Sequence, residues 1–204
     1  DAQVTRQPAG KPDKLTDPEL HTGSRIPTKP EAIPSAGAAA LAKSFAQCVY
    51  RTSRAKATAL LNNSDLGSVN LASGRIRDLD TDLNMSRCLD AEVTNDLPVG
   101  AIRFPMPVLR DLLAEEAYLA ANPVPPKVAT PPVTIQPRFV STGPALAKAQ
   151  TLHVFADCAI VEDVSHADNL LRTKPGSVEE RAAARALAPA LGACLAEGQQ
   201  IELT

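Results

Sequence analysis

Large aromatic side chains are almost absent from this 204-residue sequence, which has no tryptophan and only 3% aromatic residues. Hydrophobic residues still make up 44% of the chain, which is typical of a globular protein rather than a wholly disordered one. Any core must therefore be built mainly from alanine, leucine and valine. Because these side chains bury less area than aromatic rings, we expect covalent staples to add to the stability of the fold.

Neither sign of charge is in large excess, since 21 lysines and arginines stand against 23 aspartates and glutamates. No basic stripe with interleaved aromatic residues occurs, so we predict no nucleic-acid partner. Long hydrophobic runs are also missing. The longest apolar stretch, at 36–42, is too short to cross a bilayer, and the sequence predicts no transmembrane segment.

Catalytic motifs are lacking as well: the ten glycines form no phosphate-binding or dinucleotide-binding loop, and no G-x-S-x-G elbow is present. His21, His153 and His166 stand outside known catalytic patterns and are interpreted as surface or packing residues. The adjacent pairs Glu115-Glu116 and Glu179-Glu180 do not face each other on a helix, so no carboxylate dyad is indicated. We predict a non-enzymatic protein with no cofactor and no metal.

Alternating acidic residues at 78–84 resemble the start of a calcium loop. Leu83 and Leu89, however, occupy the places where that loop requires glycine and a bidentate glutamate. We interpret the segment instead as a solvated face on which acidic and basic side chains lie together. Its members are Asp78, Asp80, Asp82 and Asn84 with Arg75, Arg77 and Arg87.

Proline is distributed unevenly, with six of its 18 copies at 1–36 and seven at 122–144. Proline lacks the backbone donor and blocks helix formation, so both segments are expected to be extended or polyproline-like. We predict an N-terminal arm at 1–36 and a linker at 122–144. Two proline-poor segments remain, 37–121 and 145–204.

The two proline-poor segments contain the same motifs in the same order. A Phe-Ala-x-Cys motif at 45–48 recurs at 155–158, and each copy is followed by Leu-Leu, Gly-Ser-Val and Cys-Leu. This ordered recurrence predicts an internal duplication, with one helical repeat unit in each segment. The later matches are Leu60-Leu61 with Leu170-Leu171, Gly67–Val69 with Gly176–Val178, and Cys88-Leu89 with Cys194-Leu195.

Apolar residues recur at helical spacing in each repeat, as at Leu41, Phe45 and Val49. Ser53 and Asp163 occupy equivalent positions, and both are good helix N-caps, so a second short helix is predicted to begin at each. The Leu-Leu pair of that helix is expected to face the core.

The final helices of the two repeats are predicted to differ. Ser177 and Glu180 fit a capping box, and Pro189 is expected to break or kink the helix that they open. The first repeat continues through an extended piece at 101–104 to a further helix opened by Pro107. The second repeat reaches 201–204, where that piece would lie, so we expect either that it lacks the last helix or that the given sequence stops before it. The apolar face of that last helix in the first repeat comprises Leu109, Leu112, Leu113 and Tyr118.

Four cysteines at repeated positions favour disulfides and an oxidising compartment. Three pairings are open, and the duplication favours Cys48–Cys88 with Cys158–Cys194, one bridge in each repeat. The spacing disfavours a zinc site, and the apolar helical setting of each cysteine disfavours a catalytic thiol. Together with the polar start at residues 1–3, which lacks Met, the bridges predict an exported protein whose signal peptide has been removed, either periplasmic or at the cell surface.

These motifs, with Arg103-Phe104-Pro105 and the leucines and Tyr118 that follow, resemble small exported alphaproteobacterial proteins of unknown function, especially those of sphingomonads. The resemblance covers both repeats and omits the arm and the linker. It implies export and a cysteine-containing helical repeat, but no activity and no functional residues. The absence of a last helix from the second repeat departs from the usual pattern.

The sequence thus predicts a mainly α protein of two related helical units, each with its own disulfide, joined by an extended linker and preceded by an extended arm. We expect a structural or interaction protein, an accessory subunit of a periplasmic or cell-surface assembly. A pre-extended arm and linker suit contacts with other protein subunits, identical or different, because they lose less entropy on binding. The alternative is a small-ligand binding protein with an apolar pocket between the repeats.

Overall fold

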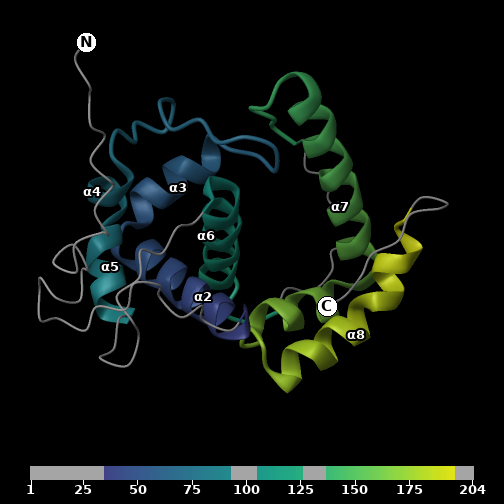
Figure 1. Cartoon of the computed structure of the whole chain (residues 1–204). Helices are drawn as coiled ribbons and strands as arrows, with labels where there is room; N and C mark the ends of the chain where they lie inside the picture. Colours follow the sequence, from purple (N-terminus) through teal and green to yellow (C-terminus); the bar gives the residue numbers. More distant parts are fainter. Residues whose placement is uncertain (1–34, 93–104, 126–136, 196–204) are drawn as a thin grey trace, which may run out of the picture. The chain divides into compact units, whose positions relative to one another are not determined.

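The structure is a computed structural model that describes residues 35–92, 105–125 and 137–195. It confirms the mainly α prediction, because these residues form seven α-helices and no β-strand (Figure 1). The predicted arm lies outside the described residues up to 34, as do 126–136 of the linker and the pieces at 101–104 and 201–204. The helices are α2 (Ser35–Thr52), α3 (Arg54–Asn62), α4 (Leu79–Leu83), α5 (Met85–Glu92), α6 (Met106–Ala121), α7 (Gly143–Arg172) and α8 (Val178–Ala193).

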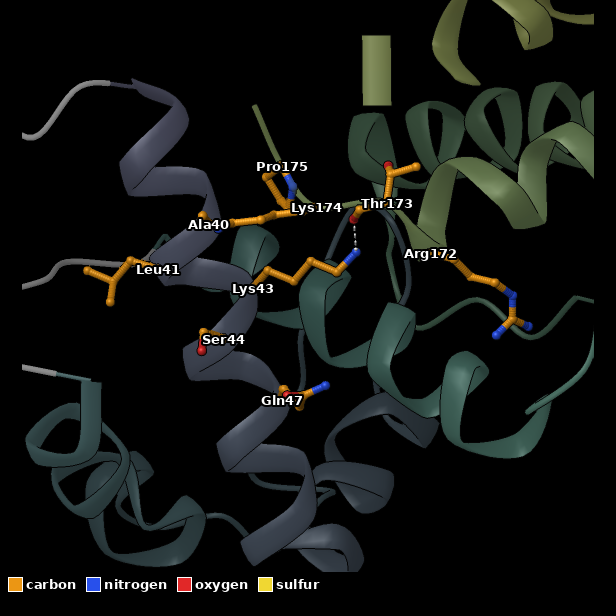
Figure 2. Close-up of a pocket in the computed structure, with 9 residues that line it drawn as sticks. All are labelled: Ala40, Leu41, Lys43, Ser44, Gln47, Arg172, Thr173, Lys174 and Pro175. Carbon is orange, nitrogen blue, oxygen red and sulfur yellow. Dashed lines mark hydrogen bonds between the residues drawn. The ribbon is translucent and has the colours of Figure 1, made fainter. Parts of the chain in front are cut away.

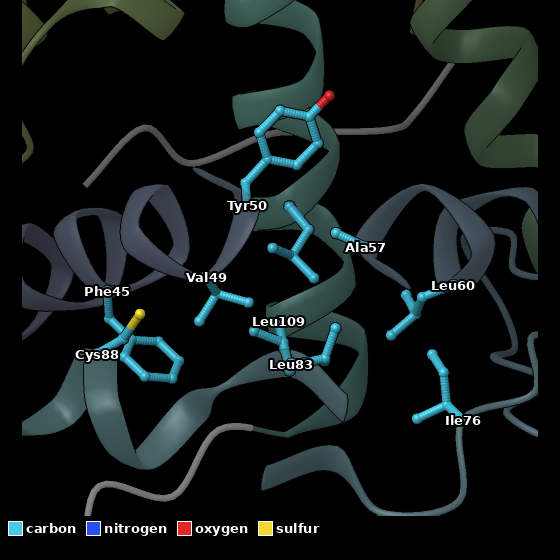
Figure 3. Packing of buried hydrophobic residues seen from close by; sticks show 10 residues of the cluster. Phe45, Val49, Tyr50, Ala57, Leu60, Ile76, Leu83, Cys88 and Leu109 are labelled. Carbon is cyan, nitrogen blue, oxygen red and sulfur yellow. The ribbon is translucent and has the colours of Figure 1, made fainter. Parts of the chain in front are cut away.

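Helices α2 to α6 form the first half of the described chain, residues 35–125, and surround one hydrophobic cluster (Figure 3). Phe45 and Val49 of α2 are fully buried, as the helical spacing of apolar residues predicted. Leu60 of α3 and the α6 residues Leu109 and Leu113 complete its centre. The cluster draws buried side chains from all five of these helices, with Leu83 from α4 and Cys88 from α5. Its buried members are Phe45, Val49, Tyr50, Ala57, Leu60, Ile76, Leu83, Cys88, Leu109 and Leu113.

Helices α7 and α8 form the second half, residues 137–195, and pack against each other as a hairpin. Its buried hydrophobic residues are mostly alanines: Ala149, Ala159, Ala183 and Ala190, with Leu187. Alanine removes little apolar surface from water, so this half gains less hydrophobic stabilisation than the first.

The two predicted helix breaks are both present. Ser53 separates α2 from α3 with φ −130° and ψ 37°. Asp163 interrupts α7 with φ −155° and ψ 78°, so that this long element consists of two helices across a kink. Asp163 accepts a hydrogen bond from the backbone N–H of His166 at 3.0 Å, as an N-cap residue does. Ser53 makes no such bond; its hydroxyl accepts one from the Asn84 amide at 2.7 Å.

The start of α8 has the Ser177 half of the predicted capping box, whereas Glu180 accepts from the residue before the N-cap. The Ser177 hydroxyl accepts from the Glu180 N–H at 3.0 Å, and the Glu180 carboxylate accepts from the Gly176 N–H at 2.6 Å. The predicted break at Pro189 is wrong, because α8 continues through this residue to Ala193. The last helix of the first half, α6, begins one residue earlier than predicted, because Pro107 is its second residue and not its first.

Both predicted disulfides are present, and no cysteine is free. Cys48–Cys88 joins α2 to α5, and Cys158–Cys194 joins α7 to the end of α8. The bridges span 40 and 36 residues of sequence, so each is expected to contribute roughly 3–4 kcal/mol by restricting the unfolded chain. The pairing rules out the zinc and catalytic-thiol alternatives.

Candidate functional site

The aspartates at 78–82 stabilise a local turn. The Asp78 carboxylate caps α4 by accepting from the N–H groups of Asp80 and Thr81 at 2.8 and 3.1 Å. Asp82 forms an ion pair with Lys56 at 2.8 Å and accepts from the Arg77 N–H at 2.9 Å. The bond from Lys56 is the main reason why the pKa of Asp82 is lowered to about 2.

This arrangement changes the interpretation of the segment in one respect. The carboxylates are exposed or half-buried, as a solvated face requires, yet their bonds go to backbone N–H groups, to Lys56 and to Ser86, whose hydroxyl donates to Asp80 at 2.6 Å. Within the described residues, no group of three or more His, Cys, Asp or Glu side chains is placed to hold a metal ion.

The structure describes two histidines, His153 and His166, and each lies beside a single aspartate. His21 lies outside the described residues. The His166 ring nitrogen lies 2.5 Å from the Asp163 carboxylate, on the exposed side of the α7 kink. The His153 ring lies 3.2 Å from the Asp157 carboxylate and packs edge-on against Phe139. These contacts fit the predicted surface and packing roles.

The adjacent glutamates of α6 differ sharply in their surroundings. Glu115 forms an ion pair with Lys43 of α2 at 2.6 Å. Glu116 is only 6% exposed, and its Oε1 atom has no hydrogen-bond partner. Burial, followed by the charge of Glu115, raises the pKa of Glu116, while Lys43, Gln47 and Arg51 of α2 partly offset this. The edge of α6 that carries Glu116 therefore faces α2.

A buried aspartate, Asp65, joins the first half to the start of the second. Its carboxylate accepts from the backbone N–H groups of Val140 and Ser141 at 2.7 Å and from the Ser141 hydroxyl at 2.5 Å. The N–H groups of Gly67 and Ser68 donate to it at 2.8 and 2.9 Å. Burial acts to raise the pKa of Asp65, but these bonds outweigh it and lower the pKa to about 2. We call this set the Asp65 network.

Gly67 permits the close approach that the Asp65 network requires. A Cβ atom at this position would lie 2.5 Å from the Ala145 carbonyl oxygen and 2.7 Å from the Ser141 hydroxyl. Both distances are shorter than real contacts allow, so no other residue fits without displacing α7. Gly67 is part of the Gly-Ser-Val motif found in the sequence, and these short distances explain why glycine is needed at this position.

A second buried aspartate, Asp168, lies between α6 and α7. It is 2% exposed and accepts from the Tyr118 hydroxyl at 2.8 Å. Arg172 donates to both of its oxygens, at 2.6 and 2.8 Å, and to the Asn122 carbonyl at 2.6 Å. The bond from Arg172, reinforced by Tyr118, lowers the pKa of Asp168 against the opposing effect of burial. This Asp168 network is saturated by partners within the chain.

Beside this contact is an open pocket of about 540 Å³, lined by residues of α2 and by residues 172–175 (Figure 2). Lys43 lies at its wall and donates to the carbonyl oxygens of Leu171 and Thr173 at 2.5 and 3.0 Å. With its bond to Glu115, this lysine is fully engaged, and Arg172 is held by Asp168. Lys43 and Arg172 are therefore committed to partners within the chain, and Lys174 is a further cation that lines the pocket.

A second open groove, of about 550 Å³, is lined on its apolar side by Leu66, Val108, Leu112 and Leu171. Arg110, Asp111, Glu115 and Tyr118 contribute polar groups to it. Both this groove and the first pocket are lined by residues of the two halves, and the groove has the more leucine-rich lining of the two.

The halves also differ on the surface of α7. Val154, Ile160 and Val161 are 67%, 49% and 53% exposed. Their equivalents in α2 by the repeat pattern are Ser44, Tyr50 and Arg51. Tyr50 is buried in the first core, whereas Ile160 is exposed to water. At the other two positions, the polar residues Ser44 and Arg51 of α2 are replaced by valines in α7.

Comparison of the chain with protein-family models, with curated proteins and with solved structures finds no match. No helix within the described ranges has the length and apolar character needed to cross a membrane. The site must therefore be interpreted from its own chemistry.

Sequence reasoning did not find the Asp65 and Asp168 networks. Asp65 lies two residues before Gly67, a spacing typical of an Asx-turn, and this was the one local signal available. Asp168 gives no such signal, because its partner Tyr118 lies 50 residues away.

Proposed function

We propose that this chain is a non-enzymatic exported interaction protein, an accessory subunit of a periplasmic or cell-surface assembly. The observation that carries the proposal is the aliphatic surface of α7, where Val154, Ile160 and Val161 are all about half exposed or more. Soluble proteins expose single apolar residues routinely, but a group on one helix face is typical of a contact surface.

The use of titratable groups supports a non-enzymatic role. An active site needs convergent acids, bases or nucleophiles that can reach a substrate. Asp65 and Asp168 are buried and bonded to partners within the chain, and all four cysteines are in disulfides. Glu116 of α6 has a raised pKa, but its side chain is buried on the side of α6 that faces α2. The two aspartates and the cysteines thus have structural uses in the fold, and Glu116 is not placed in a cleft with other acids or bases.

Export is supported by the two disulfides, since such bonds persist in oxidising compartments. Within this proposal the proline-rich arm and linker are further contact surfaces. Their proline content is the reason, since it favours an extended chain that loses little entropy on binding. Membership of the exported alphaproteobacterial group, and the duplication itself, belong to the same proposal.

The test is capture of partners from a native envelope extract with the tagged full chain and with a variant lacking residues 1–36. We expect a stoichiometric protein partner with the full chain and a weaker yield without the arm. Recovery of the chain alone in both cases, under mild crosslinking, contradicts the proposal.

The groove beside Leu66 and Leu171 favours a second candidate function, the binding of a small apolar ligand. The apolar lining of the groove favours binding of such a ligand. The groove is open to solvent, however, and ligand sites usually bury most of the ligand. Binding of an apolar fluorescent dye that is lost in Leu66→Glu but kept in Val178→Ser would favour this candidate.

A further inference from the structure

Arg110 of α6 is a cation with an incomplete set of partners. Its side chain is only 18% exposed, and its Nε atom is shielded from water and has no hydrogen-bond partner. Among the described residues its one polar partner is Asp111, whose carboxylate accepts from Nη1 at 2.8 Å. A guanidinium carries five N–H donors, so most of the hydrogen-bonding capacity of Arg110 is unused within the chain.

The pair with Asp111 holds Arg110 weakly. The Asp111 side chain is 56% exposed, and adjacent residues on a helix do not face each other. Exposed ion pairs of this kind contribute little to stability, because water competes for both groups. Another carboxylate can therefore replace Asp111 at small cost, and Asp111 then turns to the solvent.

Arg110 lines the second groove, the one of about 550 Å³ beside Leu66 and Leu171. Val108 and Leu112 lie one turn apart on α6 and extend the apolar side of this groove, and Val108 is 44% exposed. The volume is in the range of small-molecule sites. Of the described residues that line the groove, Arg110 is the one cation among aliphatic side chains.

The other polar groups of the lining are already bonded. Glu115 is paired with Lys43 at 2.6 Å, so its charge is compensated. The Tyr118 hydroxyl donates to Asp168 at 2.8 Å. Arg110 is therefore the group that selects the head of a ligand. A carboxylate head complements it, an uncharged head gains no ion pair, and an ammonium head is repelled.

We propose that this groove binds a linear amphiphile with a carboxylate head, of the fatty-acid class. Its chain lies on the leucines of the groove, and its head bonds Arg110 in place of Asp111. This inference rests on the second candidate function, the binding of a small apolar ligand, and names the chemical class of that ligand.

The test is isothermal titration calorimetry of the full disulfide-bonded chain with three ligands of one chain length: decanoate, 1-decanol and decylammonium, each below its micelle concentration. Decanoate is expected to bind at least tenfold more tightly than decanol, and decylammonium is expected to bind most weakly. Arg110→Gln is expected to weaken decanoate to the level of decanol, whereas Arg110→Lys, which keeps the charge, retains part of the preference. Arg138→Gln changes an exposed arginine outside the groove lining and is the matched control, expected to bind as the parent does.

Asp111→Asn removes the competing carboxylate, so decanoate is expected to bind at least about threefold more tightly, with decanol unchanged. Circular dichroism checks that each variant folds. Equal affinity of the parent chain for decanoate and decanol, or a preference that survives Arg110→Gln, would overturn the inference. Uptake of the chain by phosphatidylglycerol vesicles without binding of decanoate would also overturn it, since the ligand is then a membrane lipid.

The inference and the candidate function can fail separately. If decanol binds as tightly as decanoate and Leu66→Glu abolishes both, the small-ligand function stands and the carboxylate preference falls. If no ligand binds, the candidate function falls as well, and the envelope capture still tests the interaction role independently.

Discussion

Phe45 in the first half is fully buried among leucines, whereas Phe155, at the equivalent place in the second half, remains partly exposed. Leu60 and Leu170 differ in the same way. In the first half, α6 adds Leu109 and Leu113 to the cluster, and within the described residues the second half has no such helix. Two segments with the same motifs in the same order thus differ in structure. The first forms a closed core because α6 covers it, and the second remains an open hairpin of α7 and α8.

The largest expected effect compares the two phenylalanines. Phe45→Ala removes a fully buried ring and is expected to lower the free energy of unfolding by about 3–5 kcal/mol. Phe155→Ala removes a partly exposed ring, and about 1 kcal/mol is expected. Urea denaturation followed by circular dichroism measures both. Equal losses would mean that the second half is as closed as the first.

The two disulfides provide the next comparison. Removing either bridge by paired Cys→Ala substitution is expected to cost about 3–4 kcal/mol in the chain-entropy model. Without Cys158–Cys194, α8 is held to α7 mainly by alanine packing, so limited proteolysis is expected to cut within 143–193. Loss of Cys48–Cys88 is expected to leave the first core protected. The opposite cleavage pattern contradicts the account.

A smaller effect tests how the halves are joined. Asp65→Asn removes a charge that accepts five hydrogen bonds and is expected to cost about 2–3 kcal/mol. Because the folded pKa of Asp65 is lowered to about 2, its contribution is present above the unfolded pKa, near 3.8, and is lost as the pH falls through about 2. Denaturation between pH 5 and pH 2 measures this.

Asp111→Asn is the control for this measurement, since Asp111 is exposed. It is expected to keep the parent's acid dependence, whereas Asp65→Asn flattens it. A parent-like acid profile in Asp65→Asn would show that the network contributes little to stability.

The smallest effect concerns Glu116. Its folded pKa is raised, so the stability linked to its protonated form is present below the unfolded pKa and is lost as the pH rises through the folded value. Glu116→Gln removes the buried charge and is expected to stabilise the protein by about 1 kcal/mol at pH 7, with no difference at low pH. Thermal unfolding at pH 4 and pH 7 measures it. Glu115→Gln, which loses the pair with Lys43, is expected to destabilise slightly, and a destabilised Glu116→Gln contradicts the assignment.

Local signals predicted much of the fold. The disulfide pairing followed from the repeated cysteines, and the break at Asp163 followed from its cap chemistry. The break at Ser53 is present as predicted, but its hydroxyl makes no cap hydrogen bond. These features depend on residues close in sequence or matched by the repeat. Of the two outcomes predicted at Pro189, the break is wrong, because α8 continues past this residue although the ring removes a backbone donor there.

Features that depend on approach in space could not be predicted. Asp65 meets Ser141 across 76 residues, and Asp168 meets Tyr118 across 50. The acidic run at 78–82 was interpreted as a surface face because alternation alone does not reveal that Asn84 takes a left-handed conformation, with φ 52°, between α4 and α5. The exposed aliphatic residues of α7, Val154, Ile160 and Val161, become apparent only when exposure in the two halves is compared.

The most direct measurement of the difference between the halves is hydrogen–deuterium exchange of the full chain, read by mass spectrometry with both disulfides intact. The account predicts that peptides from α2 and α6 exchange at least tenfold more slowly than peptides from α7 and α8, because opening of the hairpin exposes little apolar surface. Equal protection of α7 and α2 would contradict an open second half, and with it the uncovered face on which the proposed function rests.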